Sequence, residues 1–191
     1  AKLPKNFNTK KEAEDFLNQN IGSKYKVADL ETKPTKKSPT SPFTTSTLQQ
    51  EAARKLYLPV GITMQLAQRL YEAGLITYMR TDSVNLSKEA MDAAEAEIIK
   101  SYGKEYSKPR VFANKNKGAQ EAHEAIRPTD MSRHSVNIDR DQARLYDLIW
   151  KRTLASQMSD AQLERTNVKI EADNHNELFA ASGEVLLFEG F

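Results

Sequence analysis

The chain has 191 residues, and its 28 lysines and arginines against 26 aspartates and glutamates leave a formal net charge of +2. The lack of cysteine excludes disulfides, thiolate catalysis and cysteine-based zinc sites. No run approaches the roughly 18 apolar residues of a membrane span and the first residues do not form a signal peptide, so we expect a cytoplasmic protein with no membrane partner.

The N-terminal part of the chain is expected to hold one short helix and one strand. Thr9 and Glu12 form a capping box, which predicts a helix that begins near Thr9. Tyr25 and Val27 alternate with polar residues, as in a strand. Residues 31–42 are rich in Lys, Thr, Ser and Pro, and this composition predicts a linker or an extended arm.

Two helices joined by a tight turn are predicted next. Ser46 and Gln49 form a second capping box, and Pro59 marks the turn before the second helix. Gly74 suits the position just after that helix, where a left-handed backbone is common. Residues 75–79 are rich in β-forming side chains and predict a short strand. The layout resembles a helix-turn-helix with a wing-like strand, which is often used against DNA.

The second half of the chain is expected to hold two more helices and then strands. Ser87 is expected to cap the third helix, and the polar, lysine-rich residues 103–118 predict a mobile loop. A fourth helix is predicted from Asp139 to about Met158, with Asp139 and Gln142 as its cap. Beyond it the pattern changes to alternation, and Leu178–Phe188 should give one or two further strands.

Together these elements predict an α+β fold that is mainly helical. A helical unit of about residues 41–158 is expected to be inserted between two strand-bearing ends, residues 1–40 and 159–191. Because both ends carry strands, we expect them to pair into one small β-rich element.

Tyr78 and Arg80 are the first candidates for chemistry. In an extended chain, residues two apart point to the same face, so one phosphate could meet both side chains. A phenol, with a pKa of about 10, is a poor nucleophile near neutral pH, and a nearby cation would stabilise the phenolate and the attacked phosphate. Arginine suits that role because its planar fork binds phosphate oxygens and stays charged. The alternative is a half-buried strand tyrosine beside a surface arginine, and spacing alone favours it.

The stretch of residues 120–129 holds a second candidate site. If it starts as a helical turn, His123 and Arg127 lie four apart on one face, with Glu124 adjacent. His123 would then hydrogen-bond a phosphate oxygen or move a proton, and Arg127 would hold the phosphate. The alternative, a capped helix end with an exposed histidine, fits these residues at least as well.

The remaining polar groups indicate DNA less specifically. Hydroxyl and backbone N–H groups at the helix start within residues 41–50 would make an anion-binding spot, although plain N-capping explains most of them. His134 and His175 show no metal-ligand spacing with the scattered carboxylates, so no metal site is predicted and both are expected on the surface. The net charge is too small to indicate nucleic acid by itself. Contacts with the DNA backbone would come from local basic residues, namely Lys33, Lys36, Lys37, Arg54, Lys55 and Arg69.

Three stretches, taken together, resemble the type IA family of bacterial DNA topoisomerases. They are Ser41–Gln50, Ala67–Ser83 and Gln120–Thr129, and their order and spacing match the central region of that family over nearly the whole chain. The resemblance implies that Tyr78 attacks one DNA strand and leaves a 5′-phosphotyrosine and a free 3′-hydroxyl. It also implies that Arg80 holds the scissile phosphate and that His123 lies near it.

The resemblance extends to supporting residues and to domains. Positions expected to support the site or to contact DNA are Arg127, Thr81, Asp82, Thr44, Ser46, Gln50 and Arg69. The helical unit corresponds to the tyrosine-bearing domain of the family, which has a helix-turn-helix core, and the flanking strands correspond to its arch domain. The implied activity is the relaxation of negative supercoils, and the implied partner is DNA of the nucleoid, with a preference for single strands.

The resemblance also implies magnesium, which the family binds through the clustered carboxylates of a toprim domain. No such cluster is present in this sequence. We therefore expect a monomeric fragment of a longer enzyme that holds no cofactor itself and works with the toprim and remaining domains. Alone, it should cleave and rejoin DNA very weakly or not at all.

Two other functions fit part of the pattern. A non-enzymatic helix-turn-helix module would bind DNA with the same helices, and Tyr78 would merely pack. A tyrosine recombinase also combines Tyr, Arg and His, but its tyrosine follows the other catalytic residues in sequence. Because Tyr78 precedes His123 and Arg127, the order disfavours a recombinase.

Overall fold

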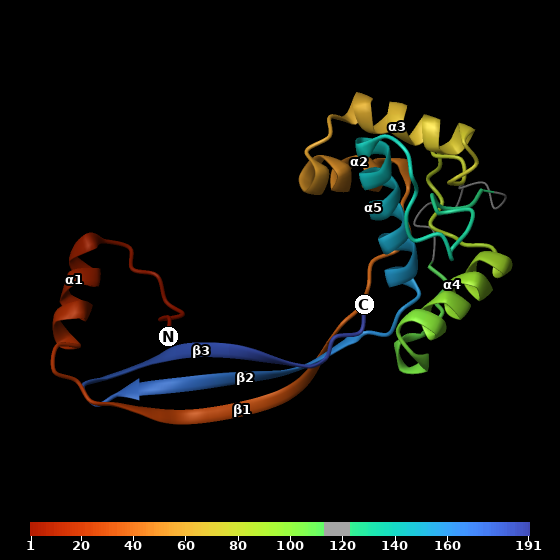
Figure 1. Ribbon diagram of the computed structural model, residues 1–191. Helices are drawn as coiled ribbons and strands as arrows, with labels where there is room; N and C mark the ends of the chain where they lie inside the picture. Colours follow the sequence, from red (N-terminus) through yellow and green to blue (C-terminus); the bar gives the residue numbers. More distant parts are fainter. Residues whose placement is uncertain (113–122) are drawn as a thin grey trace. The chain divides into compact units, whose positions relative to one another are not determined.

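The computed structural model describes residues 1–112 and 123–191, which form two compact units. The first unit comprises Ala1–Lys37 and Ala161–Glu189, and the second comprises Ser38–Asp160 and Gly190–Phe191. In the described residues, the first unit holds a three-stranded antiparallel sheet and one α-helix, and the second holds four α-helices (Figure 1). The fold is therefore α+β and mainly helical, as predicted. None of the helices in these ranges has the length and apolar character that crossing a membrane requires.

The sheet of the first unit consists of β1 (Tyr25–Lys37), β2 (Ala161–Ala172) and β3 (His175–Phe188), in that order. β1 pairs with β2 over its whole length, from Tyr25 opposite Ala172 to Lys37 opposite Ala161. Of the two predicted alternatives for residues 31–37, the linker is therefore wrong: the segment is extended as part of β1, because β2 supplies a pairing partner that local composition does not reveal. Pro34 fits there because β1 lies at an edge of this sheet, where a strand tolerates a missing N–H.

The helix of the first unit, α1 (Lys10–Gln19), begins as predicted. Thr9 Oγ1 accepts the N–H of Glu12 at 3.2 Å, which confirms the capping box. Phe16 of α1 packs against β3, with its ring centroid 4.8 Å from that of His175 and 6.1 Å from that of Phe179. The side chain of His175 is only 6% exposed, so its predicted surface position is wrong.

The second unit is built from α2 (Thr45–Glu51), α3 (Val60–Glu72), α4 (Lys88–Ser101) and α5 (Arg140–Ser156). α2 continues into a π-helical turn, η1 (Ala52–Leu56), and a short 3₁₀ helix, η2 (Lys104–Tyr106), follows α4. Ser87 and Asp139 cap α4 and α5, which confirms both predictions. Apolar side chains at helical spacing meet in one core, whose fully buried members include Leu48, Leu70, Ile98, Leu145 and Ile149.

α2 begins after Thr44 and not after Ser46, as its capping bonds show. Thr44 Oγ1 accepts the N–H of Thr47 at 3.3 Å, and Thr47 Oγ1 accepts the N–H of Thr44 at 2.9 Å. Thr47 therefore plays the reciprocal part that we expected from Gln49. Residues 44–47 all carry hydroxyl groups, and the sequence alone does not show which of them caps α2.

Gly74 lies just after the end of α3, as predicted. Gly74 has a φ of +69°, its N–H donates to the Tyr71 carbonyl at 2.8 Å, and the N–H of Leu75 donates to the Leu70 carbonyl at 2.9 Å. These two bonds make a Schellman motif, which turns the chain sharply out of the helix.

The strand predicted over residues 75–79 is wrong. One isolated bridge joins Ile76 to Pro128, and the rest of the segment is irregular. Its β-forming side chains are used for burial instead, since Leu75, Ile76 and Met79 lie in the core. The segment that carries Tyr78 is therefore fixed by tertiary contacts and not by a sheet.

The part of residues 103–118 that the structure describes is anchored and partly helical. Beyond η2, Arg110 Nη2 pairs with Asp160 Oδ1 at 2.8 Å, and the N–H of Arg110 donates to Gln157 Oε1 at 2.9 Å. The predicted loop is thus wrong for residues 104–106, which form η2, whereas residues 108–112 are a loop that Arg110 anchors. Its remaining residues, 113–118, lie outside the described residues.

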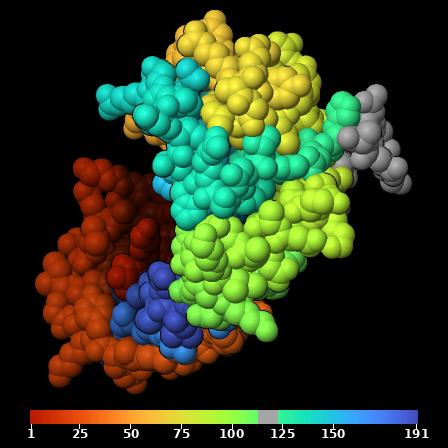
Figure 2. All heavy atoms as spheres, turned by 45° about the vertical axis from the view of Figure 1, so that its right-hand side comes forward, coloured from red at the N-terminus to blue at the C-terminus, as the bar shows by residue number. Residues whose placement is uncertain are grey.

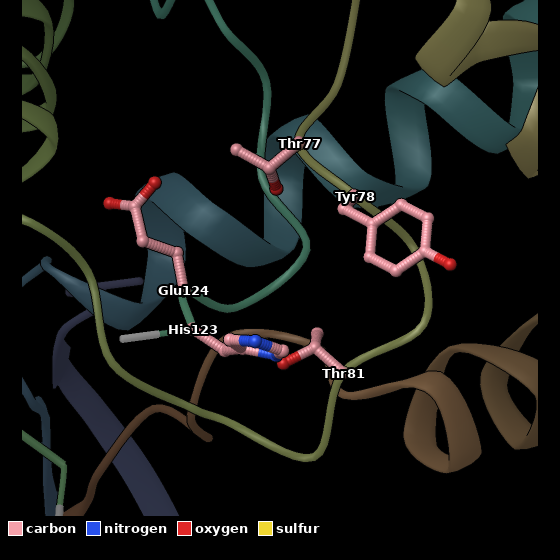
Figure 3. Close-up of a pocket in the computed structure, with 5 residues that line it drawn as sticks. All are labelled: Thr77, Tyr78, Thr81, His123 and Glu124. Carbon is pink, nitrogen blue, oxygen red and sulfur yellow. The ribbon is translucent and has the colours of Figure 1, made fainter. Parts of the chain in front are cut away.

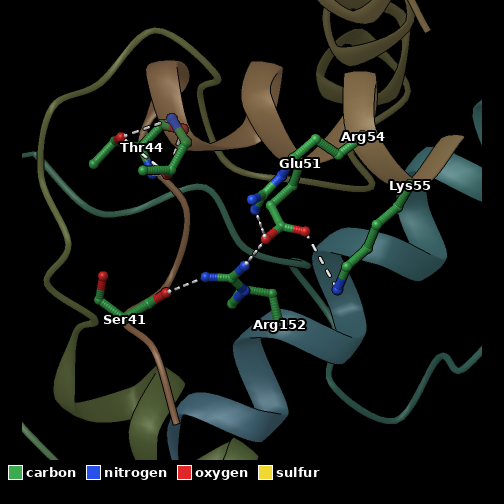
Figure 4. A network of polar contacts seen from close by, with 7 residues as sticks. Ser41, Thr44, Glu51, Arg54, Lys55 and Arg152 are labelled. Atoms are coloured by element: carbon green, nitrogen blue, oxygen red, sulfur yellow. Dashed lines mark hydrogen bonds and ion pairs between the residues drawn. The ribbon is translucent and has the colours of Figure 1, made fainter. Parts of the chain in front are cut away.

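A network of charges holds α2 to α5 (Figure 4). Glu51, whose side chain is 11% exposed, pairs with Arg54 at 2.7 Å, Arg152 at 3.0 Å and Lys55 at 3.2 Å. Burial acts to raise the pKa of the Glu51 carboxyl, but Lys55 and then the two arginines lower it on balance. The Arg152 guanidinium also lies over the Phe43 ring, with its Cζ 4.4 Å from the ring centroid. The segment that leads into α2 is therefore held against α5.

Candidate active site

A cavity of about 330 Å³ opens beside the segment that follows α3, and we call it the Tyr78 cavity. Among the described residues, it is lined by Thr77, Tyr78, Thr81, His123 and Glu124. Figure 3 shows the His123 ring next to Thr81 and the Tyr78 hydroxyl directed away from Glu124. Tyr78 and His123, which come from two separate motifs, therefore line one cavity.

Tyr78 is half exposed and held on one side. It is 47% exposed, and its ring meets that of Tyr71 on α3 edge-on, with centroids 5.3 Å apart and planes at 66°. An edge-on contact of this kind favours one orientation of the ring. A ligand in solution can therefore reach a phenol whose ring is already partly positioned.

Hydrogen bonds join the segment that carries Tyr78 to the stretch of residues 120–129. Thr77 N–H donates to the Arg127 carbonyl at 2.9 Å, Arg127 N–H donates to Thr77 Oγ1 at 3.0 Å, and that hydroxyl donates to the Ala125 carbonyl at 2.8 Å. Residues 123–127 are consequently not a helical turn. The prediction that His123 and Arg127 share a helix face is wrong, because the backbone groups bond to another segment. Residues 120–122 of the motif lie outside the described residues.

Arg127 and Glu124 form an ion pair at the wall of the Tyr78 cavity. Arg127 Nη2 lies 2.7 Å from Glu124 Oε2, and the arginine side chain is only 16% exposed. Burial acts to raise the pKa of the Glu124 carboxyl, but hydrogen bonds from Arg127 and Ser87 lower it on balance. Glu124 is therefore a cavity residue, a role that the sequence reading did not give it.

Arg80 does not share the Tyr78 cavity. It lines a second hollow of about 430 Å³, together with Arg69 and other residues of the exposed side of α3, Met64, Gln65, Gln68 and Glu72. The expectation that Tyr78 and Arg80 point to one face is therefore wrong, because the segment bends and does not form an extended strand. The hollow does bring together two arginines, Arg69 and Arg80, that were predicted to contact DNA.

On the surface of the second unit, the segment that follows His123 runs between α3 and α4 (Figure 2).

The candidate residues within the stretch 41–50 have different surroundings. Ser46 and Gln50 are exposed, whereas Thr44 is partly buried as the cap of α2. The N–H groups of Thr45 and Thr47 are already bonded, to the Thr81 carbonyl at 2.9 Å and to Thr44 Oγ1 at 3.3 Å. The start of α2 therefore has few free donors for an anion. The residue of this motif that reaches the Tyr78 segment is Thr45, which the sequence reading did not select.

Thr81 and Asp82 lie three and four residues after Tyr78 in the sequence. Thr81 is buried and lines the cavity, and its hydroxyl accepts the N–H of Ser83 at 3.0 Å. Asp82 is exposed. In the parts of the chain that the structure describes, no three His, Asp or Glu side chains gather closely enough to hold a metal ion.

The sequence is similar to that of a known enzyme family. A family model described as DNA topoisomerase matches residues 1–191. The DNA topoisomerase 1 of Zymomonas mobilis is 54% identical over 169 residues, which cover 87% of this chain and 14% of that protein. The DNA topoisomerase 1 of Pasteurella multocida is 48% identical over 193 residues, which cover 98% of this chain and 22% of that protein.

The structure is similar to a solved one as well. It matches full-length topoisomerase I from Thermotoga maritima with a TM-score of 0.81 and 35% identity, over 97% of this chain and 31% of that chain. The chain thus spans less than a third of each of these three proteins.

Proposed function

The chain belongs to the bacterial DNA topoisomerase family, and on that premise we propose that it is the part of a type IA enzyme that carries the strand-cleaving nucleophile, Tyr78. The main support is that Tyr78 is half exposed and lines one cavity with His123. The complete enzyme would use this cleavage to relax negative supercoils.

In the proposed reaction, Tyr78 Oη attacks the phosphorus of one phosphodiester. The Oη–P bond forms while the bond from phosphorus to the 3′ oxygen breaks, the phenol loses its proton and the 3′ oxygen takes one up. The products are a 5′-phosphotyrosine and a free 3′-hydroxyl, and the reverse attack rejoins the strand. One phosphodiester replaces another, so the step needs no ATP.

The proposed roles of the other residues follow from the chemistry of the cavity. His123 donates a hydrogen bond to a non-bridging oxygen of the attacked phosphate. Arg80 holds the same phosphate only after its side chain leaves the hollow beside α3, so we include that movement on DNA binding in the proposal. Arg69, at the same hollow, would contact a neighbouring phosphate, and Thr44, Ser46, Gln50 and Asp82 would support the DNA path.

The proposal includes domains and a metal that lie elsewhere in the complete enzyme. The helical unit would be the tyrosine domain, inserted into an arch domain that includes the sheet. The described residues do not fit a magnesium site, since they hold no cluster of three acidic or histidine side chains. Magnesium would be held by a toprim domain. The chain by itself should therefore cleave and rejoin DNA very weakly.

The decisive experiment traps the covalent intermediate. The complete enzyme, incubated with a 5′-labelled and a 3′-labelled single-stranded oligonucleotide and then denatured, should carry the label that lies 3′ of the break. Tyr78→Phe should abolish the covalent complex and supercoil relaxation while binding the oligonucleotide normally. Relaxation by Tyr78→Phe would show instead that the tyrosine merely packs, as in a non-enzymatic helix-turn-helix module.

A binding assay tests the proposed partner separately. Gel shifts of the chain with single-stranded and duplex DNA of one length, over a range of salt, should show tighter binding to single strands and a steep loss with salt. A preference for duplex DNA would favour the helix-turn-helix module. We also propose that the protein is a monomer, which sedimentation with and without DNA would check, and that it is cytoplasmic, which cell fractionation would check.

A further inference from the structure

Thr45 holds the turn that carries Tyr78 at two backbone positions. Its Oγ1 donates to the Met79 carbonyl at 2.8 Å and accepts the N–H of Thr81 at 2.9 Å. Its own N–H donates to the Thr81 carbonyl at 2.9 Å. Thr45 therefore fixes the backbone of Met79 and Thr81, which follow Tyr78 in the turn.

The part of the turn just before Tyr78 is held independently. Thr77 bonds through its N–H to Arg127 and through its hydroxyl to Ala125. The backbone is thus tied on both sides of Tyr78, while nearly half of Tyr78 itself is exposed. An irregular segment fixed in this way can present one side chain in a defined direction.

Thr45 itself has a rigid support. It is the first residue of α2, and the residue two before it, Phe43, is fully buried and accepts the N–H of Ile126 at 2.9 Å through its carbonyl. At the other end of α2, Glu51 is paired with Arg152 of α5. A side chain on such a base positions its partners more precisely than a loop residue would.

From these contacts we propose that Thr45 is a positioning residue for strand cleavage. Its hydroxyl sets the direction in which Tyr78 meets the phosphate, and it does not touch the DNA itself. This inference rests on the proposed function of Tyr78. It differs from the sequence expectation, which gave supporting roles in this stretch to Thr44, Ser46 and Gln50.

The test uses the complete enzyme with two substitutions at Thr45. Thr45→Val keeps the shape of the side chain and loses the hydroxyl, whereas Thr45→Ser keeps the hydroxyl. Because small misplacements of a reacting group slow a reaction strongly, we expect Thr45→Val to form the covalent complex about tenfold to a hundredfold more slowly in single turnover. Its affinity for single-stranded DNA should stay at the wild-type value, and Thr45→Ser should restore most of the rate.

Thr153 provides a matched control for loss of stability. Its hydroxyl is buried and donates to the Ile149 carbonyl at 2.9 Å inside α5, so Thr153→Val loses the same kind of bond away from the Tyr78 turn. Thr153→Val should leave the cleavage rate unchanged, and its unfolding midpoint measures what a lost buried hydroxyl bond does to stability alone. Equal slowing by Thr153→Val and Thr45→Val would overturn the inference, because the effect would then be general destabilisation.

Two further outcomes separate this inference from the proposed function. If Thr45→Val cleaves at the wild-type rate while Tyr78→Phe is inactive, Thr45 has no positioning role but Tyr78 remains the nucleophile. If Tyr78→Phe still forms the covalent complex, the proposed function itself fails. Should Thr45→Val not fold, Thr45→Ala carries the same prediction, since it loses the hydroxyl without adding bulk.

Discussion

Arg127 donates through Nη2 to Glu124 Oε2 at 2.7 Å, so the arginine expected to hold phosphate is held by a carboxylate at the wall of the Tyr78 cavity. The same arginine donates to the Pro128 carbonyl at 2.9 Å, and Glu124 Oε1 accepts the N–H of Ser87 at 2.7 Å. A phosphate that enters the cavity must therefore compete with Glu124 for Arg127. The charges of these two residues should therefore affect the proposed binding of DNA.

The first prediction is that Glu124→Gln tightens the binding of single-stranded DNA. Glutamine can still accept the N–H of Ser87, but it carries no charge, so Nη2 of Arg127 becomes available for a phosphate. One additional phosphate contact should strengthen binding severalfold in low salt and make the slope of log K against log salt steeper by about 0.7. Fluorescence anisotropy of a labelled oligonucleotide across a salt series measures both.

A control for net charge is Glu177→Gln. Glu177 lies in the other unit and pairs with Lys5 at 3.1 Å, so its loss changes the charge of the protein equally without freeing Arg127. This variant should show a smaller gain in affinity and an unchanged slope. Weaker DNA binding by Glu124→Gln would contradict the competition between Glu124 and phosphate.

The second prediction concerns the sharp turn after α3. Gly74 has a φ of +69°, and a Cβ added there meets no atom within 4 Å. Gly74→Ala therefore introduces backbone strain without a clash, and it should destabilise the second unit by about 1–2 kcal/mol. Denaturant unfolding, followed by the fluorescence of Trp150 in that unit, measures the change.

Gly61, at the second position of α3, is the matched control. A Cβ added at Gly61 also meets no atom within 4 Å, and its φ lies outside the left-handed region. Gly61→Ala should therefore stabilise the same unit by about 0.4–1 kcal/mol, because alanine restricts the unfolded chain. Equal effects of the two substitutions would mean that the left-handed turn is not the cause.

The third prediction is a loss of stability in acid that depends on Asp160. Hydrogen bonds from Lys108 and Ser38, together with the charge of Arg110, outweigh burial and lower the pKa of the Asp160 carboxyl from 3.8 to about 2. A carboxyl that is more acidic in the folded state stabilises the fold above its unfolded pKa. That stability should be fully present above pH 4 and should disappear as the pH falls from about 4 towards 2.

Asp160→Asn checks the assignment. At neutral pH the variant should lose about 1–2 kcal/mol of stability, since two cationic partners keep only a neutral acceptor. Its unfolding free energy should then vary less between pH 4 and pH 2 than that of the wild-type protein. Parallel pH curves for the two proteins would assign the acid sensitivity to other carboxyls.

Local chemistry in the sequence determined where several elements begin and end. Thr9, Ser87 and Asp139 cap their helices, and Gly74 ends α3, because capping and helical periodicity act within a few residues along the chain. The long motifs likewise were enough to indicate the family. These features need no knowledge of distant partners.

Only the tertiary structure decided how the candidate site is assembled. β1 extends to Lys37 because β2 pairs with it, and Tyr78 lies in an irregular turn because Thr45, Ala125 and Arg127 bond to that turn from elsewhere. The sequence likewise did not indicate that Arg127 pairs with Glu124 or that Arg80 lies outside the Tyr78 cavity. In a segment without regular structure, the direction of a side chain depends on hydrogen bonds to residues far away in sequence, and spacing along the chain carries no information about them.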